Sequence, residues 1–263
     1  MIEDLIRQVD SLQRQVDGLI QPEITRDMIS PFRAIPGLVG FWPMSSVQRS
    51  TGNAYDLSGQ GRTMTYNGNP TYNVQNTFTP YIDLDGTGDF LSRADETDLD
   101  ILGTETIFPT GRRGMTMGGW FYAGALAAVS GLIGKWTATG NQRSYLLESL
   151  TTGEIRAIVS SDGTATTTVT TTTQYATGQW LFCWMRFIPS TSLQVAVNNI
   201  ITTETTSIPA AIFNSTAALQ IGAFNAGTQL LTGRASLCFL SACRVPQAVL
   251  SALFQQTRGL FGV

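Results

Sequence analysis

From residue 37 onward the sequence is a succession of short apolar runs separated by turn residues, and no other feature restricts the fold as much. Residues 144–149, 154–160 and 164–173 follow one another at the spacing of roughly 8–12 residues that is typical of β-sandwiches. The 3.6-residue period of an amphipathic helix is absent from these runs. The sequence therefore predicts a mainly β protein built as an antiparallel sandwich.

Three further runs specify particular strands. Residues 180–187 are apolar on both faces, which predicts a central strand covered above and below, the deepest of the fold. Residues 192–198 alternate and end at Asn198 and Asn199, a pair that can take the positive φ of a two-residue hairpin turn. Residues 81–93 predict a strand, a tight turn at glycines and a second strand. The other predicted strands cover 40–44, 115–123, 131–136, 218–224 and 233–243.

Only residues 246–256 show the helical period in this part of the chain. Apolar residues share one face, and Pro246 suits the first turn of a helix. The apolar face consists of Val249, Leu250, Leu253 and Phe254. We therefore expect one short C-terminal helix.

The first 20 residues have a heptad period. Apolar residues recur at alternating spacings of three and four, namely at Ile2, Leu5, Val9, Leu12, Val16 and Leu19. Ile6 and Ile20 widen the stripe beyond what a dimer needs, so the pattern predicts a parallel trimeric coiled coil over residues 1–20 and a homotrimeric protein. A single helix packed on its own domain is the alternative. Residues 21–36, with three prolines, form a predicted connector or collar before the domain of residues 37–263.

Composition excludes several functions. The chain has no histidine, which removes Ser-His-Asp and Cys-His catalysis and most zinc sites. Its net charge is −3 and Lys135 is its single lysine, so no basic patch of lysines can bind nucleic acid. Cys183, Cys238 and Cys243 lack the spacing of a metal or redox motif and are predicted to be buried thiols. No run resembles a signal peptide or a bilayer-spanning helix, so we expect a cytoplasmic product without membrane insertion.

Six short motifs, in order, resemble concanavalin A-like, laminin G-like jelly-roll domains over about residues 37–260. They are Gly40 to Met44, Asp56 to Gly61, Leu84 to Leu91, Met115 to Trp120, Gly178 to Trp180, and the turn after Val195 to Val197. Pro43 and Met44 stand where the family pattern has an acidic residue. Any metal or ligand role that this acidic residue has in the family is therefore not expected here. The resemblance implies a jelly roll.

The order of coil and domain resembles virion proteins of tailed bacteriophages. It implies a non-enzymatic structural protein of the virion, a fibre, spike or capsid decoration, which is made in the host cytoplasm. Its N-terminal region would bind other virion proteins, and its heads would be free to contact host-surface glycans. A free carbohydrate-binding lectin or adhesin is the alternative, and a glycoside hydrolase comes third.

The hydrolase interpretation requires acids that the sequence lacks. Glucanases of this fold carry Glu-x-Asp-x-x-Glu on one strand, and the three acids share one cleft. The nearest match begins at Glu96 and Asp98, but Ile101 occupies the place of the second glutamate. Retaining hydrolysis needs two carboxyl groups about 5 Å apart. We therefore expect no enzymatic activity.

Two weaker sets of candidate site residues remain. Trp136 beside a polar loop is the indole most suited to a surface, and Lys135, Trp136 and Arg143 are candidate glycan contacts. Trp42, Trp120, Trp180 and Trp184 lie on apolar strands and are predicted to be core. Carboxylates in turns could hold a structural calcium ion, or could simply cap those turns. They are Asp56, Asp83, Asp85 and Asp89. No other cofactor is expected.

Overall fold

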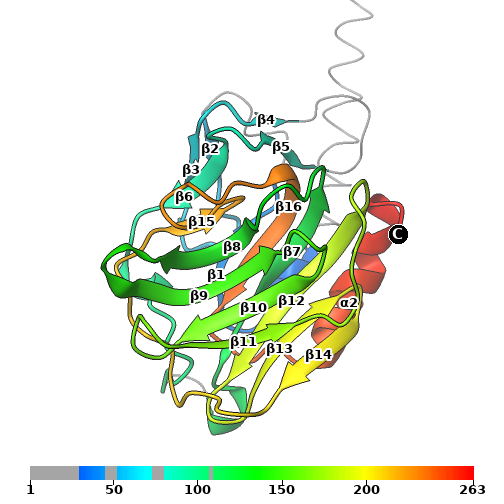
Figure 1. Ribbon diagram of the computed structural model, residues 1–263. Coiled ribbons are helices and arrows are strands. Elements are labelled where there is room, and N and C mark those ends of the chain that lie inside the picture. Colours follow the sequence, from blue (N-terminus) through cyan, green and yellow to red (C-terminus); the bar gives the residue numbers. More distant parts are fainter. Residues whose placement is uncertain (1–29, 45–51, 73–79, 107–108) are drawn as a thin grey trace, which may run out of the picture.

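The computed structural model describes residues 30–44, 52–72, 80–106 and 109–263 and contains two antiparallel sheets (Figure 1). Sheet A has the order β14 (Ile200–Glu204), β13 (Ser192–Val197), β12 (Trp180–Ile188), β7 (Met115–Ala123), β16 (Thr232–Ser241), β5 (Ile82–Asp85), β4 (Thr71–Tyr72), with β1 (Leu38–Trp42) also paired to β16. Sheet B has the order β11 (Thr166–Thr170), β10 (Ile155–Ser160), β9 (Gln142–Ser149), β8 (Ser130–Thr137), β15 (Leu219–Ile221), β6 (Phe90–Arg93), β3 (Met64–Asn67), β2 (Asn53–Ala54). The prediction of a mainly β, antiparallel sandwich is confirmed.

The main core lies between the two sheets and is made by every second residue of their strands. On β12, Leu181, Cys183 and Met185 face sheet B and join this core. The alternate residues Phe182 and Trp184 face away from sheet B, where they join a second core. Strand β12 is thus covered on both faces, as its continuous apolar run predicted.

The second core is closed by helix α2 (Gln247–Thr257), which lies on the outer face of sheet A (Figure 1). Trp120 stacks on Phe261 at a centroid distance of 4.2 Å, and its indole N–H donates to Thr257 Oγ1 at 2.9 Å. Phe32 stacks on Phe41 at 4.8 Å in the same core, so residues 30–36 of the predicted connector pack on the sheet. The C-terminal helix is confirmed, with its start one residue later than expected.

Three short 3₁₀ helices lie between strands in the described ranges, namely η2 (Thr97–Leu99), η3 (Thr110–Arg112) and η4 (Thr139–Asn141). A further one, η5 (Arg258–Leu260), follows α2. The three cysteines are buried and unpaired, as predicted. Burial raises the pKa of Cys183 and Cys238 well above the usual value for a thiol. The predicted coiled coil of residues 1–20 lies outside the described residues, and no helix in the described ranges is long and apolar enough to cross a membrane.

The segment 81–93 differs from the expected hairpin. Its turn is present, with Gly86 and Gly88 at φ of 78° and 84°, where a side chain would be strained. The two strands do not pair with each other, because β5 pairs with β16 in sheet A and β6 pairs with β15 and β3 in sheet B. The turn therefore carries the chain from one sheet to the other.

The hairpin between β13 and β14 is the predicted two-residue turn, with Asn198 at φ 49° and Asn199 at φ 69°. We expect Asn199→Val to lower the free energy of unfolding by about 1–2 kcal/mol, because a β-branched residue fits poorly at positive φ. Asn199→Gly should not destabilise the protein, since glycine suits this turn. Urea unfolding of both variants checks the expectation, and equal stability of the two would contradict it.

Candidate functional site

A row of aromatic and charged side chains crosses the outer face of sheet A beyond the helix. Strand register places Trp180 opposite Tyr122, Tyr122 opposite Arg234, and Arg234 opposite Asp83, on the adjacent strands β12, β7, β16 and β5. Their neighbours Leu181, Phe121, Ala235 and Leu84 all point into the main core, so alternation turns the row outward. All four side chains are half-buried. We call Trp180, Tyr122, Arg234 and Asp83 the aromatic–arginine row.

Arg234 is held on three sides. Its guanidinium carbon lies 4.8 Å from the ring centroid of Tyr122 and 4.8 Å from that of Tyr81. Its Nε donates to Asp83 Oδ1 at 2.6 Å. Burial alone would lower the pKa of Arg234, but the hydrogen bond and the charge of Asp83 outweigh it and raise that pKa above its usual value. The guanidinium is therefore a fixed, permanently charged donor.

Trp180 completes the row. Its ring lies 5.6 Å from Tyr81, 5.7 Å from Tyr122 and 4.7 Å from Phe261, at about 60° to each of the three rings. Trp180 was predicted to be core, but it is the first residue of β12 and remains partly exposed. Edge-to-face contacts with three rings fix the indole while leaving part of it in solvent.

The row combines aromatic rings with polar side-chain atoms that a ligand could reach. Among the described residues, Arg234 donates through Nε alone, so its two terminal nitrogens are free to bond a ligand. Its charge is balanced by Asp83, and both side chains are accessible, at 34% and 39% exposed. An arginine, a carboxylate and aromatic surface suit a ligand that has both hydroxyl groups and an apolar face.

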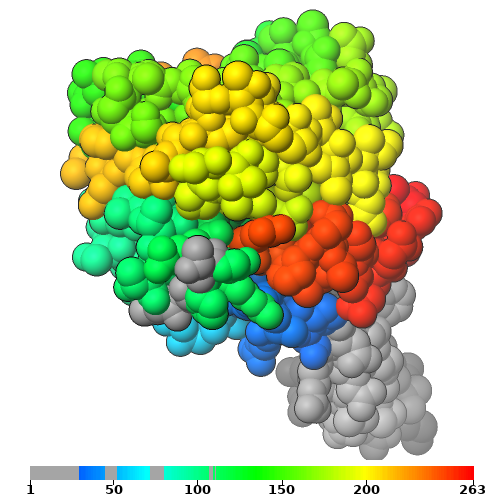
Figure 2. Space-filling view, turned by 90° about the horizontal axis from the view of Figure 1, so that it is seen from below, coloured from blue at the N-terminus to red at the C-terminus, as the bar shows by residue number. Residues whose placement is uncertain are grey.

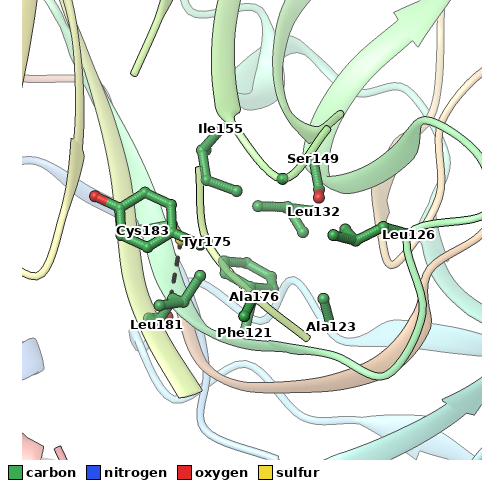
Figure 3. A pocket seen from close by; sticks show the side chains of 11 residues that line it. Phe121, Ala123, Leu126, Leu132, Ser149, Ile155, Tyr175, Ala176, Leu181 and Cys183 are labelled. Carbon is green, nitrogen blue, oxygen red and sulfur yellow. Dashed lines mark hydrogen bonds between the residues drawn. The ribbon is translucent and has the colours of Figure 1, made fainter. Parts of the chain in front are cut away.

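A small cavity lies between the sheets (Figure 3), and two of its lining residues, Phe121 and Leu181, are the sequence neighbours of Tyr122 and Trp180 in the row. Phe121, Leu132, Ile155 and Leu181 line it, and its volume is about 10 Å³. That volume holds one water molecule at most. The cavity is therefore a packing defect of the main core, too small for a sugar or a cofactor.

The structure brings together only two of the three predicted glycan contacts, because strand register pairs Trp136 on β8 with Arg143 on β9. The side chain of Lys135 has no exposed surface and pairs with Asp95 at 2.7 Å and Asp100 at 2.8 Å. Trp136 follows it on β8, so it faces the outer side of sheet B, where it is 7% exposed and packs on Leu146. Arg143 is used in a hydrogen bond to the carbonyl of Gly163. Strand alternation separates Lys135 from Trp136, and their ligand role stays a prediction.

The four predicted calcium ligands have protein partners of their own. Asp56 accepts hydrogen bonds from the backbone N–H groups of Phe41, Ser58 and Arg62, which ties β1 to the following turn. Asp83 pairs with Arg234, Asp85 caps the turn at Thr87, and Asp89 accepts from Asn69 N–H. In the described ranges no three histidine, cysteine or acidic side chains are grouped to hold a metal. The turn-capping alternative thus describes Asp56, Asp85 and Asp89, and a calcium role stays a prediction.

The acidic segment that resembled a glucanase motif is not a strand. Residues 97–99 form η2, which does not point alternate acids to one side. Glu96 pairs with both Arg62 and Arg93, and Asp98 pairs with Arg62. These acids form ion pairs with arginines, and the segment is not a strand that directs them into a cleft as the hydrolase mechanism requires.

No protein-family model and no curated protein matches the sequence, but solved structures share its fold. The receptor-binding domain of botulinum neurotoxin C/D mosaic serotype matches at a TM-score of 0.63 and 9% identity, over 83% of this chain and 51% of that one. The binding domain of Paraclostridial Mosquitocidal Protein 1 gives a TM-score of 0.63 and 9% identity, over 83% and 52%. The binding domain of botulinum neurotoxin DC in complex with SialylT gives 0.60 and 10%, over 83% and 51%. The chain thus spans about half the length of these structures, and the likeness is one of fold.

Proposed function

We propose that this protein is a non-enzymatic glycan-binding module and that the aromatic–arginine row is its sugar-contact surface. The observation that carries the proposal is the register itself. Four adjacent strands place an indole, a phenol, a guanidinium and a carboxylate in direct succession on one exposed face. None of the four is needed to fill the main core.

The chemistry of a sugar ring fits this surface. A pyranose has a face of C–H groups, which packs on aromatic rings, and hydroxyl groups at its edge, which both donate and accept hydrogen bonds. Arg234 supplies donors and Asp83 supplies acceptors at adjacent positions. Because the rings of Tyr81 and Tyr122 and the carboxylate already fix the guanidinium, little side-chain entropy is lost when a ligand binds.

The solved structures support the same class of ligand. One of them is a neurotoxin binding domain in complex with SialylT, and another concerns the cell entry of botulinum neurotoxin type C, which depends on interaction with two ganglioside molecules. The C/D mosaic structure is a receptor-binding domain, which agrees with a module that recognises rather than transforms its ligand. The absence of histidine and of an aligned acidic triad points in the same direction.

The test is a glycan array followed by titration of the best glycan. We expect Trp180→Ala and Arg234→Ala each to weaken binding at least roughly tenfold, because tryptophan and arginine dominate such contact surfaces. Tyr55→Ala is the matched control, as Tyr55 is 38% exposed and lies outside the row. Circular dichroism establishes that each variant is folded. Unchanged binding in both row variants, or equal loss in the control, would refute the proposal.

A structural role in a virion is the second candidate, and the heptads of the N-terminal residues favour it. We propose that Ile2, Leu5, Val9 and the later seam residues form a trimer that presents three glycan-binding heads. Sedimentation should give three times the mass of one chain. Leu5→Asp with Leu12→Asp should yield monomers, because charges in a closed apolar seam have no partners. A wild-type monomer, or purified particles that lack the protein, would exclude this role.

A further inference from the structure

Four arginines gather at the other end of sheet A from the aromatic–arginine row. Arg186 lies six residues along β12 from Trp180, roughly 20 Å at 3.3 Å per residue. Arg112 and Arg113 precede β7, and Arg244 follows β16. The N–H of Arg244 donates to the carbonyl of Arg112 at 2.9 Å, so these two segments lie side by side, as the green and orange surfaces of Figure 2 show. We call Arg112, Arg113, Arg186 and Arg244 the arginine cluster.

The position of the cluster is fixed by the fold. Thr116 on β7 lies opposite Arg186, and its hydroxyl donates to the carbonyl of Cys243 and accepts from the N–H of Val245. Arg186 itself donates to the carbonyl of Val245 at 2.7 Å. These bonds hold the segment that carries Arg244 against the end of β12. These hydrogen bonds, and not only the conformations of flexible side chains, therefore bring the four arginines together.

Among the described residues, no carboxylate forms an ion pair with these arginines. Arg186 is only 6% exposed, yet its side-chain partners are neutral, the amide of Gln194 at 2.8 Å and the carbonyl of Val245. Burial lowers the pKa of Arg186, and the charge of Arg244 lowers it further.

The donors of the cluster are largely unused. Arg113 Nε is buried without a hydrogen-bond partner in the described structure. Arg112 and Arg244 are exposed. Helix α2 begins at Gln247, shortly after Arg244, so the positive end of the helix dipole adds to the positive potential of the arginines. The chain has 16 basic residues against 19 acidic ones, so four arginines that lack an ion-pair partner in the described part of the chain contrast with its negative net charge. Uncompensated like charges destabilise a fold unless an anion joins them.

We propose that the arginine cluster is an oxyanion-binding site that takes the carboxylate or sulfate groups of an anionic polysaccharide. Arg112 and Arg244 would contact the ligand, because exposed guanidinium groups bind such oxyanions through two parallel hydrogen bonds. Arg186 is fixed below them and would contribute its charge. The proposal takes from the proposed function only that the ligand is a glycan, and its site is separate from the aromatic–arginine row.

The test uses three polymers of one backbone: dextran, carboxymethyl dextran and dextran sulfate. At physiological ionic strength we expect the wild-type protein to bind one or both charged polymers and not neutral dextran. Binding of carboxymethyl dextran alone assigns the site to carboxylates, and binding of dextran sulfate alone assigns it to sulfates. Failure to bind either charged polymer would overturn the proposal.

The variants locate the site. Arg112→Gln with Arg244→Gln should weaken binding of the charged polymer at least roughly tenfold, since two charge-assisted contacts are lost. Arg258→Gln is the matched control, because Arg258 is exposed, donates through Nε to the main-chain oxygen of Val263 at 2.6 Å, and lies beyond the far end of α2. Equal loss in the control would indicate general attraction to the polymer and refute the site.

One further variant separates this proposal from the proposed function. Trp180→Ala should leave binding of the charged polymer unchanged. If it does, while the glycan array shows no ligand for the row, only the proposed function fails. If charged-polymer binding is lost with Trp180→Ala and kept in the arginine double variant, the arginine cluster is not the site.

Discussion

Asp95→Asn combined with Asp100→Asn should lower the free energy of unfolding by about 3–5 kcal/mol, because it leaves the ammonium of Lys135 buried without a charged partner. Lys135 has no exposed side-chain surface, whereas Asp95 and Asp100 are 32% and 17% exposed. Its remaining bond is to the carbonyl of Ser215. Urea unfolding followed by tryptophan fluorescence measures the loss.

Lys135→Met provides the control. Added to the double variant, it removes the unpaired charge, so stability should return most of the way to wild type. Alone, it should cost less than the double variant, since both carboxylates can reach water. A double variant within about 1 kcal/mol of wild type, below the usual cost of an unpaired buried charge, would show that Lys135 does not depend on these acids.

The second large effect concerns the core beneath the C-terminal helix. We expect Trp120→Ala to lower the free energy of unfolding by about 3–5 kcal/mol, since a buried indole leaves a cavity. Trp120 is fully buried, stacks on Phe261 and Phe254, and donates to Thr257. The residues after α2 should also become sensitive to carboxypeptidase, because the ring that holds Phe261 is gone.

Trp120→Phe separates the ring contacts from the hydrogen bond. It should be less damaging than alanine, as Thr257 Oγ1 already bonds the carbonyl of Leu253 and keeps a partner. Thermal unfolding and time-resolved proteolysis compare the two variants. An alanine variant as stable as the phenylalanine variant would mean that helix α2 is held elsewhere.

Local patterns predicted those elements whose environment is uniform along the chain. The apolar run 180–187 became the central strand because both its faces are covered, and residues 247–257 became a helix because the period of the sequence there matches one apolar stripe. Asn198 and Asn199 indicated their turn, since few residues tolerate positive φ. Strands of two residues, such as β2 and β4, are too short to show any period.

The pairing of strands that are distant in the sequence could not be predicted from such local patterns. The run 81–93 predicted two strands and a turn, yet nothing local says that the strands join different sheets. The aromatic–arginine row depends on register between β12, β7, β16 and β5, and the arginine cluster on three separate segments. Alternation along β8 could have separated Lys135 from Trp136, because successive residues of a strand face opposite sides.

The buried state of the three thiols has a practical consequence for measuring this molecule. Thiolates, not thiols, react with alkylating probes, and burial keeps Cys183 and Cys238 protonated and out of reach. Burial also raises the pKa of Cys243, although the nearby Arg112 works against it. A single cysteine introduced on the surface could then carry a spin label or fluorophore without removal of the native ones. Distances between such labels would report how copies of the chain are arranged in solution.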